Sequence, residues 1–172
     1  MTNDVARRSV AWDPPISFLP QALLAPRRPL RALGVAWVTA FLPTLVLSAA
    51  VTALLPNDTL PKFPMVDETL FLLIVVAAPL LETLVMGAAL VLLRLFLSPT
   101  IAVLVSAVGW GIAHSLEAPA WGLVIWWPFL LFSTLFLTWR RRSLLAALGL
   151  AAAAHALHNL PPALLLLYGI AP

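Results

Sequence analysis

The 172-residue sequence contains no cysteine, which excludes disulfides, thiol nucleophiles and zinc or iron–sulfur sites built on cysteine. Charged residues are also scarce, at 10% of the chain against about 25% in a typical soluble domain. In their place, 62% of the residues are hydrophobic and the mean hydropathy is +1.02. The formal charge of +3 comes from arginines that punctuate apolar runs, which argues against a nucleic-acid partner. The composition therefore predicts an integral membrane protein whose main environment is the lipid bilayer.

Apolar runs separated by prolines, arginines and one polar loop predict the membrane-spanning helices. We expect five spans, at residues 34–55, 69–97, 100–116, 119–139 and 144–160, each close to the ~20 residues that cross a bilayer. Residues 161–162 are both proline, and the apolar stretch 163–170 either continues the fifth helix after a kink or forms a short sixth segment. The expected fold is an all-α polytopic membrane protein, a bundle of about five to six transmembrane helices with a polar site in its core.

Two parts of the chain are expected. Residues 1–31 hold five arginines and several prolines, which favours a basic cytoplasmic tail rather than a secretory signal or a long helix. Residues 32–172 form the transmembrane helical domain. With the N-terminus in the cytoplasm, all nine arginines fall on one side of the membrane and Lys62, the only lysine, falls on the other. This distribution predicts a multi-pass protein of the inner (cytoplasmic) membrane.

One carboxylate stands in an apolar helix. Glu82 has no polar neighbour apart from a threonine between residues 70 and 93, and a carboxyl group within a bilayer normally faces a partner or a water-filled cavity. It lies 12 residues from Arg94, about 18 Å along a helix, and His155 lies 13 residues from Arg142, about 20 Å. His114 lies at about 24 Å from the start of its helix, or less if that helix tilts. Three ionisable groups on three helices are thus expected at similar depth.

These groups suit acid–base chemistry on water. Glu82, poorly solvated, can act as general base for a trapped water, and a histidine can share or relay the proton. A second histidine and the amide of Asn159, one turn beyond His155 on the same face, can donate hydrogen bonds to a developing oxyanion.

Each residue also has a structural explanation. Glu82 can pair with a histidine or with a backbone group freed at Pro79, and His155 and Asn159 can form interhelical hydrogen bonds. For His158 packing is the simpler explanation, because its neighbours already occupy the face.

Three motifs carry a resemblance to a known family. They are PLLETLVMG at 79–87, WGIAH at 110–114 and HALHN at 155–159. Their order resembles the CPBP family of intramembrane proteases, which includes the CAAX prenyl-protein endopeptidases and the bacterial ABI-type proteins. That family usually has Pro-x-x-Glu-Glu-x-x-x-Arg as its first motif, an aromatic residue followed by three others and a histidine as its second, and His-x-x-x-Asn as its third. The resemblance covers residues 77–160.

The resemblance implies a mechanism without metal or cofactor. Glu82 and His114 would activate the water, and His155 with Asn159 would hold the oxyanion. The first motif departs from the family pattern, because Thr83 occupies the position of the second glutamate and a glycine occupies the position of the arginine. The residues expected to support the site are Thr83, Trp110, His158 and Arg94, the last about two turns beyond that glycine.

The leading hypothesis is an intramembrane endopeptidase that hydrolyses a peptide bond in a membrane-anchored protein or peptide substrate. A metal-dependent membrane hydrolase is an alternative, with Glu82, His114 and either His155 or His158 as zinc ligands. A non-catalytic membrane scaffold or immunity protein with the same fold is another. A proton-coupled carrier is a fourth hypothesis, although no inverted repeat is visible between the two halves of the sequence.

Overall fold

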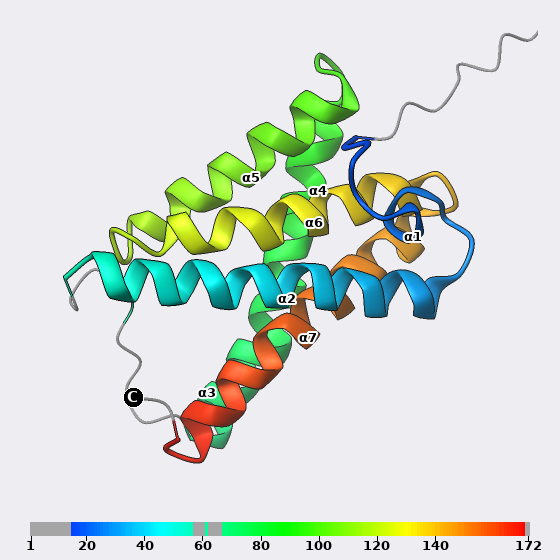
Figure 1. The fold of residues 1–172 in the computed structure, drawn as a ribbon. Coiled ribbons are helices and arrows are strands. Elements are labelled where there is room, and N and C mark those ends of the chain that lie inside the picture. Colours follow the sequence, from blue (N-terminus) through cyan, green and yellow to red (C-terminus); the bar gives the residue numbers. More distant parts are fainter. Residues whose placement is uncertain (1–14, 57–60, 62–66, 171–172) are drawn as a thin grey trace, which may run out of the picture.

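The structure is a computed structural model that describes residues 15–56, 61 and 67–170. No described residue forms a β-strand, and the arrangement of the helices is shown in Figure 1. In chain order the elements are α1 (Gln21–Leu24), α2 (Pro29–Leu54), α3 (Glu68–Leu72), the π-helical turn η1 (Leu73–Ala77), α4 (Ala78–Leu93), α5 (Pro99–Ser115), α6 (Gly122–Arg140) and α7 (Leu144–Leu167). The all-α prediction is confirmed.

Four helical segments of the described chain are long and apolar enough to cross a membrane. They are α2, the continuous run α3–η1–α4, α6 and α7, while α5 is apolar but has 17 residues, about 25 Å of helix. The chain is therefore an all-α membrane bundle. Helix α7 runs through Pro161 and Pro162 to Leu167, so the apolar stretch after the two prolines continues the fifth predicted span.

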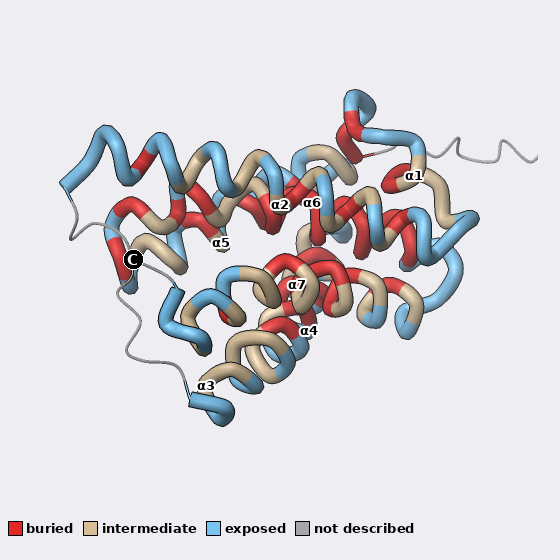
Figure 2. Tube along the Cα trace, turned by 60° about the horizontal axis from the view of Figure 1, so that its bottom comes forward, coloured by how far each residue is buried: buried red, intermediate tan, exposed pale blue. Residues whose placement is uncertain are grey.

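Helix α6 is the centre of the bundle. In its most apolar stretch 78% of the residues are buried, compared with 17–28% in the other three spans. Figure 2 shows this contrast along the chain trace. The surrounding helices turn large apolar side chains outward, such as Leu42 on α2 and Val85 on α4, as expected where lipid is the solvent.

Small residues let the helices approach closely. Ala32, Ala36 and Ala40 form a fully buried stripe at four-residue spacing on α2. Gly111 on α5 and Gly122 at the start of α6 meet backbone to backbone, because a Cβ placed on Gly122 would lie 2.0 Å from the Gly111 carbonyl oxygen. Such small-residue contacts are typical of packing between transmembrane helices, where no hydrophobic force drives helices together.

Hydrogen bonds between helices fix their register. Ser106 of α5 and Ser133 of α6 are joined through their buried hydroxyls at 2.9 Å. The Trp127 indole N–H of α6 donates to the Thr39 carbonyl of α2 at 2.8 Å. Helix α5 starts where a break was predicted, with the Ser98 side chain accepting a hydrogen bond from a first-turn backbone N–H.

The chain before α2 packs against the bundle. Ile16, Leu19, Leu23 and Leu24 are all buried and belong to the main hydrophobic core. Helix α2 begins at Pro29, so the last residues of the expected tail 1–31 belong to the first span. Residues 1–14 and Lys62, used in the sequence argument, lie outside the described residues.

Candidate functional site

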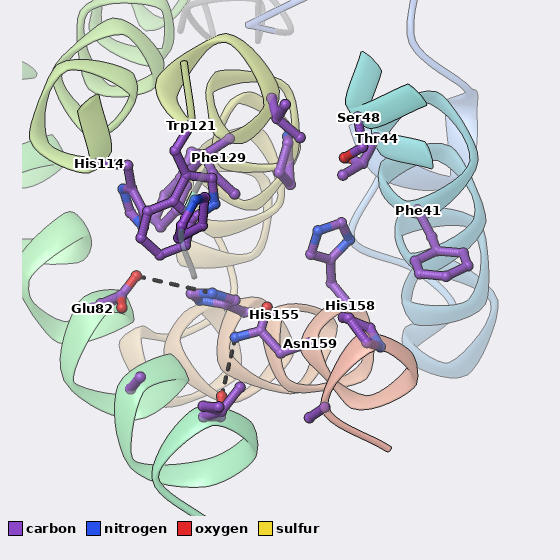
Figure 3. Close-up of a pocket in the computed structure, with 18 of the residues that line it drawn as sticks. Phe41, Thr44, Ser48, Glu82, His114, Trp121, Phe129, His155, His158 and Asn159 are labelled. Atoms are coloured by element: carbon purple, nitrogen blue, oxygen red, sulfur yellow. Dashed lines mark hydrogen bonds and ion pairs between the residues drawn. The ribbon is translucent and has the colours of Figure 1, made fainter. Parts of the chain in front are cut away.

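A cavity of about 400 Å³ lies between α2, η1–α4, α5, α6 and α7. The ionisable side chains of the three sequence motifs meet there, together with one amide, as Figure 3 shows. They are Glu82, His114, His155, His158 and Asn159. Apolar and aromatic side chains from α2, η1–α4, α6 and α7 form most of the remaining wall. The cavity is therefore an apolar space with a few convergent polar groups, as ligand sites in proteins usually are.

Glu82 projects into this cavity from α4. Its Oε2 atom lies 3.9 Å from Nε2 of His155, which is an ion-pair distance but too long for a hydrogen bond. That oxygen is buried and has no hydrogen-bond partner among the described residues, while the side chain as a whole is 27% exposed. A buried carboxylate oxygen that has no protein partner is normally protonated or hydrogen-bonded to a water or a ligand.

His155 is held between two phenylalanines of α6. Its ring stacks on Phe132 with centroids 4.8 Å apart, and its edge meets Phe129 at 5.2 Å. Nδ1 of His155 is buried and has no hydrogen-bond partner in the described part of the chain. The two phenylalanines hold the ring beside Glu82, with Nε2 toward the carboxylate and Nδ1 without a hydrogen bond to the described residues.

His114 is oriented by the backbone of its own helix. Its Nδ1 lies 2.9 Å from the Trp110 carbonyl oxygen, and since a carbonyl only accepts, Nδ1 carries the proton and Nε2 of the neutral ring can accept one. The Trp110 ring stacks on Phe129 at 4.4 Å, so Trp110 supports the site without lining the cavity. The resemblance pairs Glu82 with His114, whereas the ion-pair contact in the structure is between Glu82 and His155.

Asn159 is tied to the π-helical turn that precedes Glu82. Its Nδ2 donates to the Ile74 carbonyl at 3.0 Å. In the π register the Ala78 N–H bonds back five residues to the carbonyl of residue 73, so the donor for the Ile74 carbonyl would be residue 79. Residue 79 is proline and has no N–H, which leaves the Ile74 carbonyl for Asn159. The backbone group freed at Pro79 thus orients Asn159, and one amide N–H of Asn159 remains for a ligand.

Replacing Pro79 with alanine is expected to release Asn159. The new N–H can bond to the Ile74 carbonyl, and the two side-chain N–H protons of Asn159 should then shift in the NMR spectrum of protein labelled with ¹⁵N at asparagine. The chain has three asparagines, so Asn159→Asp assigns the signal. Pro43→Ala, in the middle of α2 and not among the residues that line the cavity, is the matched control and should leave the signal in place. An unmoved Asn159 signal in Pro79→Ala would contradict this role of the proline.

The other supporting candidates lie elsewhere. Thr83 is 2% exposed and does not line the cavity, although it follows Glu82 directly. A Cβ on Gly87 would lie 2.8 Å from the Phe136 ring, so the ring of α6 takes the space that the family's arginine would need. Arg94 lies beyond the end of α4, where its guanidinium donates to the Leu97 carbonyl, and it does not reach the cavity.

A metal site is not prearranged among the described residues, because no three of their His, Asp or Glu side chains come together at ligand spacing. Sequence reasoning also missed three side chains that shape the cavity, Phe129 and Phe132 of α6 and Thr44 of α2. Both phenylalanines lie in an uninterrupted apolar run, where nothing distinguishes a residue that clamps a histidine from one that packs in the core. Comparisons with protein-family models, with curated proteins and with solved structures found no match to this chain.

Proposed function

We propose that this chain is an intramembrane endopeptidase of the CPBP type, which hydrolyses a peptide bond in a membrane-associated protein or peptide. The supporting observation is the meeting of Glu82, His114, His155 and Asn159, from three helices, in one largely apolar cavity. A carboxylate, two imidazoles and an amide are expensive inside a membrane protein, and their convergence in one apolar space is typical of a functional site.

The proposed reaction starts from a water held beside Glu82. Glu82 takes a proton from the water as its oxygen attacks the peptide carbonyl carbon and forms the new C–O bond. The free N–H of Asn159 and an N–H of His155 donate hydrogen bonds to the oxyanion. The C–N bond then breaks, and the proton held by Glu82 passes, directly or through His114, to the leaving amine.

The distribution of charge supports an orientation with the N-terminus in the cytoplasm of a cell with an inner membrane. Arg94, Arg140 and Arg141 line one shared depression where α4 and α6 end. Glu68 lies exposed at the start of the α3–η1–α4 run, and Glu117 lies exposed in the turn that precedes α6, each at the end of its segment opposite to these arginines. Positive charge on the cytoplasmic side of short loops is the usual determinant of topology.

The test is hydrolysis by the purified protein in lipid nanodiscs. The probe is a pool of internally quenched, apolar peptides with both termini capped, so that only internal bonds can be cut. We expect fluorescence to rise and mass spectrometry to find paired fragments, with no change on addition of EDTA or 1,10-phenanthroline. Cleavage abolished by the chelators would favour the metal-dependent hydrolase, and no cleavage of any peptide would contradict the proposal.

The non-catalytic alternative has an observation of its own in favour. Thr83 and Gly87, which replace the charged residues of the family's first motif, are packed into the helical core rather than into the cavity. A scaffold or immunity protein would keep the bundle and lose the supporting charges. Its biological effect would survive Glu82→Gln, whereas that of a peptidase would not.

A further inference from the structure

His158 lines the cavity but has no task in the proposed reaction. The residue is 6% exposed, and its Nδ1 is buried without a hydrogen-bond partner among the described residues. Phe41 of α2 and Phe132 of α6 each meet its ring edge to face, with centroids 6.0 and 5.9 Å away. An imidazole whose nitrogen is unpaired in an apolar wall is costly unless something else fills the cavity.

Two hydroxyl groups of α2 line the same part of the cavity. Thr44 and Ser48 lie one helical turn apart, and in Figure 3 they and the His158 ring lie on the α2 side, away from Glu82. The Thr44 hydroxyl donates to the Ala40 carbonyl at 2.8 Å, so its oxygen keeps a lone pair for accepting a further hydrogen bond.

A peptide that is cut within the membrane needs hydrogen-bonding groups of this kind in the site. A peptide bond inside a helix is shielded by the helix itself, so the segment to be cut has to become extended at the site. Its backbone N–H and C=O groups then lie in an apolar space without water and need partners. A neutral imidazole offers one donor and one acceptor, and the hydroxyls of α2 offer further acceptors.

We propose that His158, with Thr44 and Ser48, binds the main chain of an extended, apolar segment of the substrate, on the side of the cavity away from Glu82. The surrounding wall suits apolar side chains, since Leu45 and Leu166 line it as well. This inference rests on the proposed peptidase function and names its substrate class: an extended stretch of membrane-embedded peptide, recognised by its backbone.

Two substitutions separate binding from packing. His158→Phe keeps a ring between Phe41 and Phe132 but removes both nitrogens, and His158→Gln keeps a donor and an acceptor without the ring. In nanodiscs, with the internally quenched peptides described above, we expect His158→Phe to raise KM about tenfold or more, as expected for the loss of a buried hydrogen bond, with kcat less affected. His158→Gln should recover much of the loss. A His158→Phe protein with the KM of the wild type would overturn the proposal.

A binding measurement keeps this inference separate from the peptidase itself. The probe is a fluorescein-labelled, terminally capped decapeptide of leucine, alanine and valine, measured by anisotropy on the Glu82→Gln protein, so that nothing is cut. We expect binding that weakens about tenfold in the Glu82→Gln, His158→Phe protein. Equal binding by the two proteins, or binding by neither, would overturn the site. Binding that depends on His158, together with a wild type that cuts nothing, would support the site and contradict the peptidase.

Discussion

Glu82→Gln and His155→Ala combined in one chain are expected to slow peptide hydrolysis no further than either substitution alone. The two side chains are 3.9 Å apart and face the same cavity. In the proposed reaction they therefore act on the same attack of one water on one carbonyl. Glu82→Gln should lower kcat by about a hundredfold to ten-thousandfold, the usual contribution of a positioned acid–base group. His155→Ala should lower kcat by about a hundredfold to a thousandfold, as expected for the loss of an oxyanion donor. Groups that act as a unit show such non-additive losses. The measurement is kcat and KM of the wild type, both single variants and the double variant in nanodiscs.

The control for this comparison of single and double variants is Thr83→Val. Thr83 follows Glu82 in the sequence, is buried, and its hydroxyl has no hydrogen-bond partner among the described residues. Valine has nearly the same shape, so hydrolysis should stay close to that of the wild type. If the losses from Glu82→Gln and His155→Ala instead multiplied in the double variant, the two residues would act independently, and the shared site would be wrong.

Gly122→Ala is expected to destabilise the bundle by more than about 3 kcal/mol, above the usual range for an overpacked core position. The new Cβ would lie 2.0 Å from the Gly111 carbonyl oxygen and 2.2 Å from the Ser115 hydroxyl. The first of these atoms belongs to the backbone, so no change of rotamer relieves the overlap and α5 has to move away from α6. His114 lies between residues 111 and 115, so the site would move as well. The thermal unfolding of the purified protein in detergent measures the effect.

Gly109→Ala, on the facing helix α5, is the control. A Cβ at Gly109 meets nothing within 4 Å, and alanine favours the helix over glycine. This variant should melt at the temperature of the wild type or slightly above it. A Gly122→Ala protein as stable as Gly109→Ala would contradict the close contact between α5 and α6.

The spans could be predicted from the sequence because the bilayer leaves few choices. Within a bilayer, an apolar run of about 20 residues has to form a helix, and capping residues and prolines in the sequence mark where that helix begins and ends. The break before α5 is an example, since Ser98 caps the helix and Pro99 occupies its first position. The state of the chain after Pro161 could not be predicted, because a proline inside a transmembrane helix is tolerated when neighbouring groups satisfy the freed carbonyl.

The meeting of the candidate residues in one place could be predicted, but their pairing could not. Helix rise gave the depth of Glu82, His114 and His155, and all three line the same cavity. The depth of a residue in the membrane does not determine how its helix is rotated or at what angle it crosses its neighbours. The contact of Glu82 with His155 could therefore be found only in the structure. The position of Arg94 also needed the structure. In a helical projection it falls on the same side as Gly87, yet it lies just past the end of α4, where its guanidinium donates a hydrogen bond to the Leu97 carbonyl.

The contribution of α2 and of the π-helical turn was also beyond the sequence. Thr44 and Phe41 lie in an ordinary apolar run, and the packing of α2 against α6 and α7 brings them to the cavity. The bond between Asn159 and the Ile74 carbonyl depends on a shift of register before Pro79 that no periodicity in the sequence reveals.

The most direct test of the proposed peptidase is the mass spectrum of a capped, apolar peptide after incubation with the protein in H₂¹⁸O. The account predicts two fragments from one internal bond, with ¹⁸O in the new carboxylate, because water activated at Glu82 supplies that oxygen. The Glu82→Gln protein should form these fragments at least about a hundredfold more slowly, while Thr83→Val forms them at the rate of the wild type. Fragments formed equally fast by the Glu82→Gln protein would contradict the account.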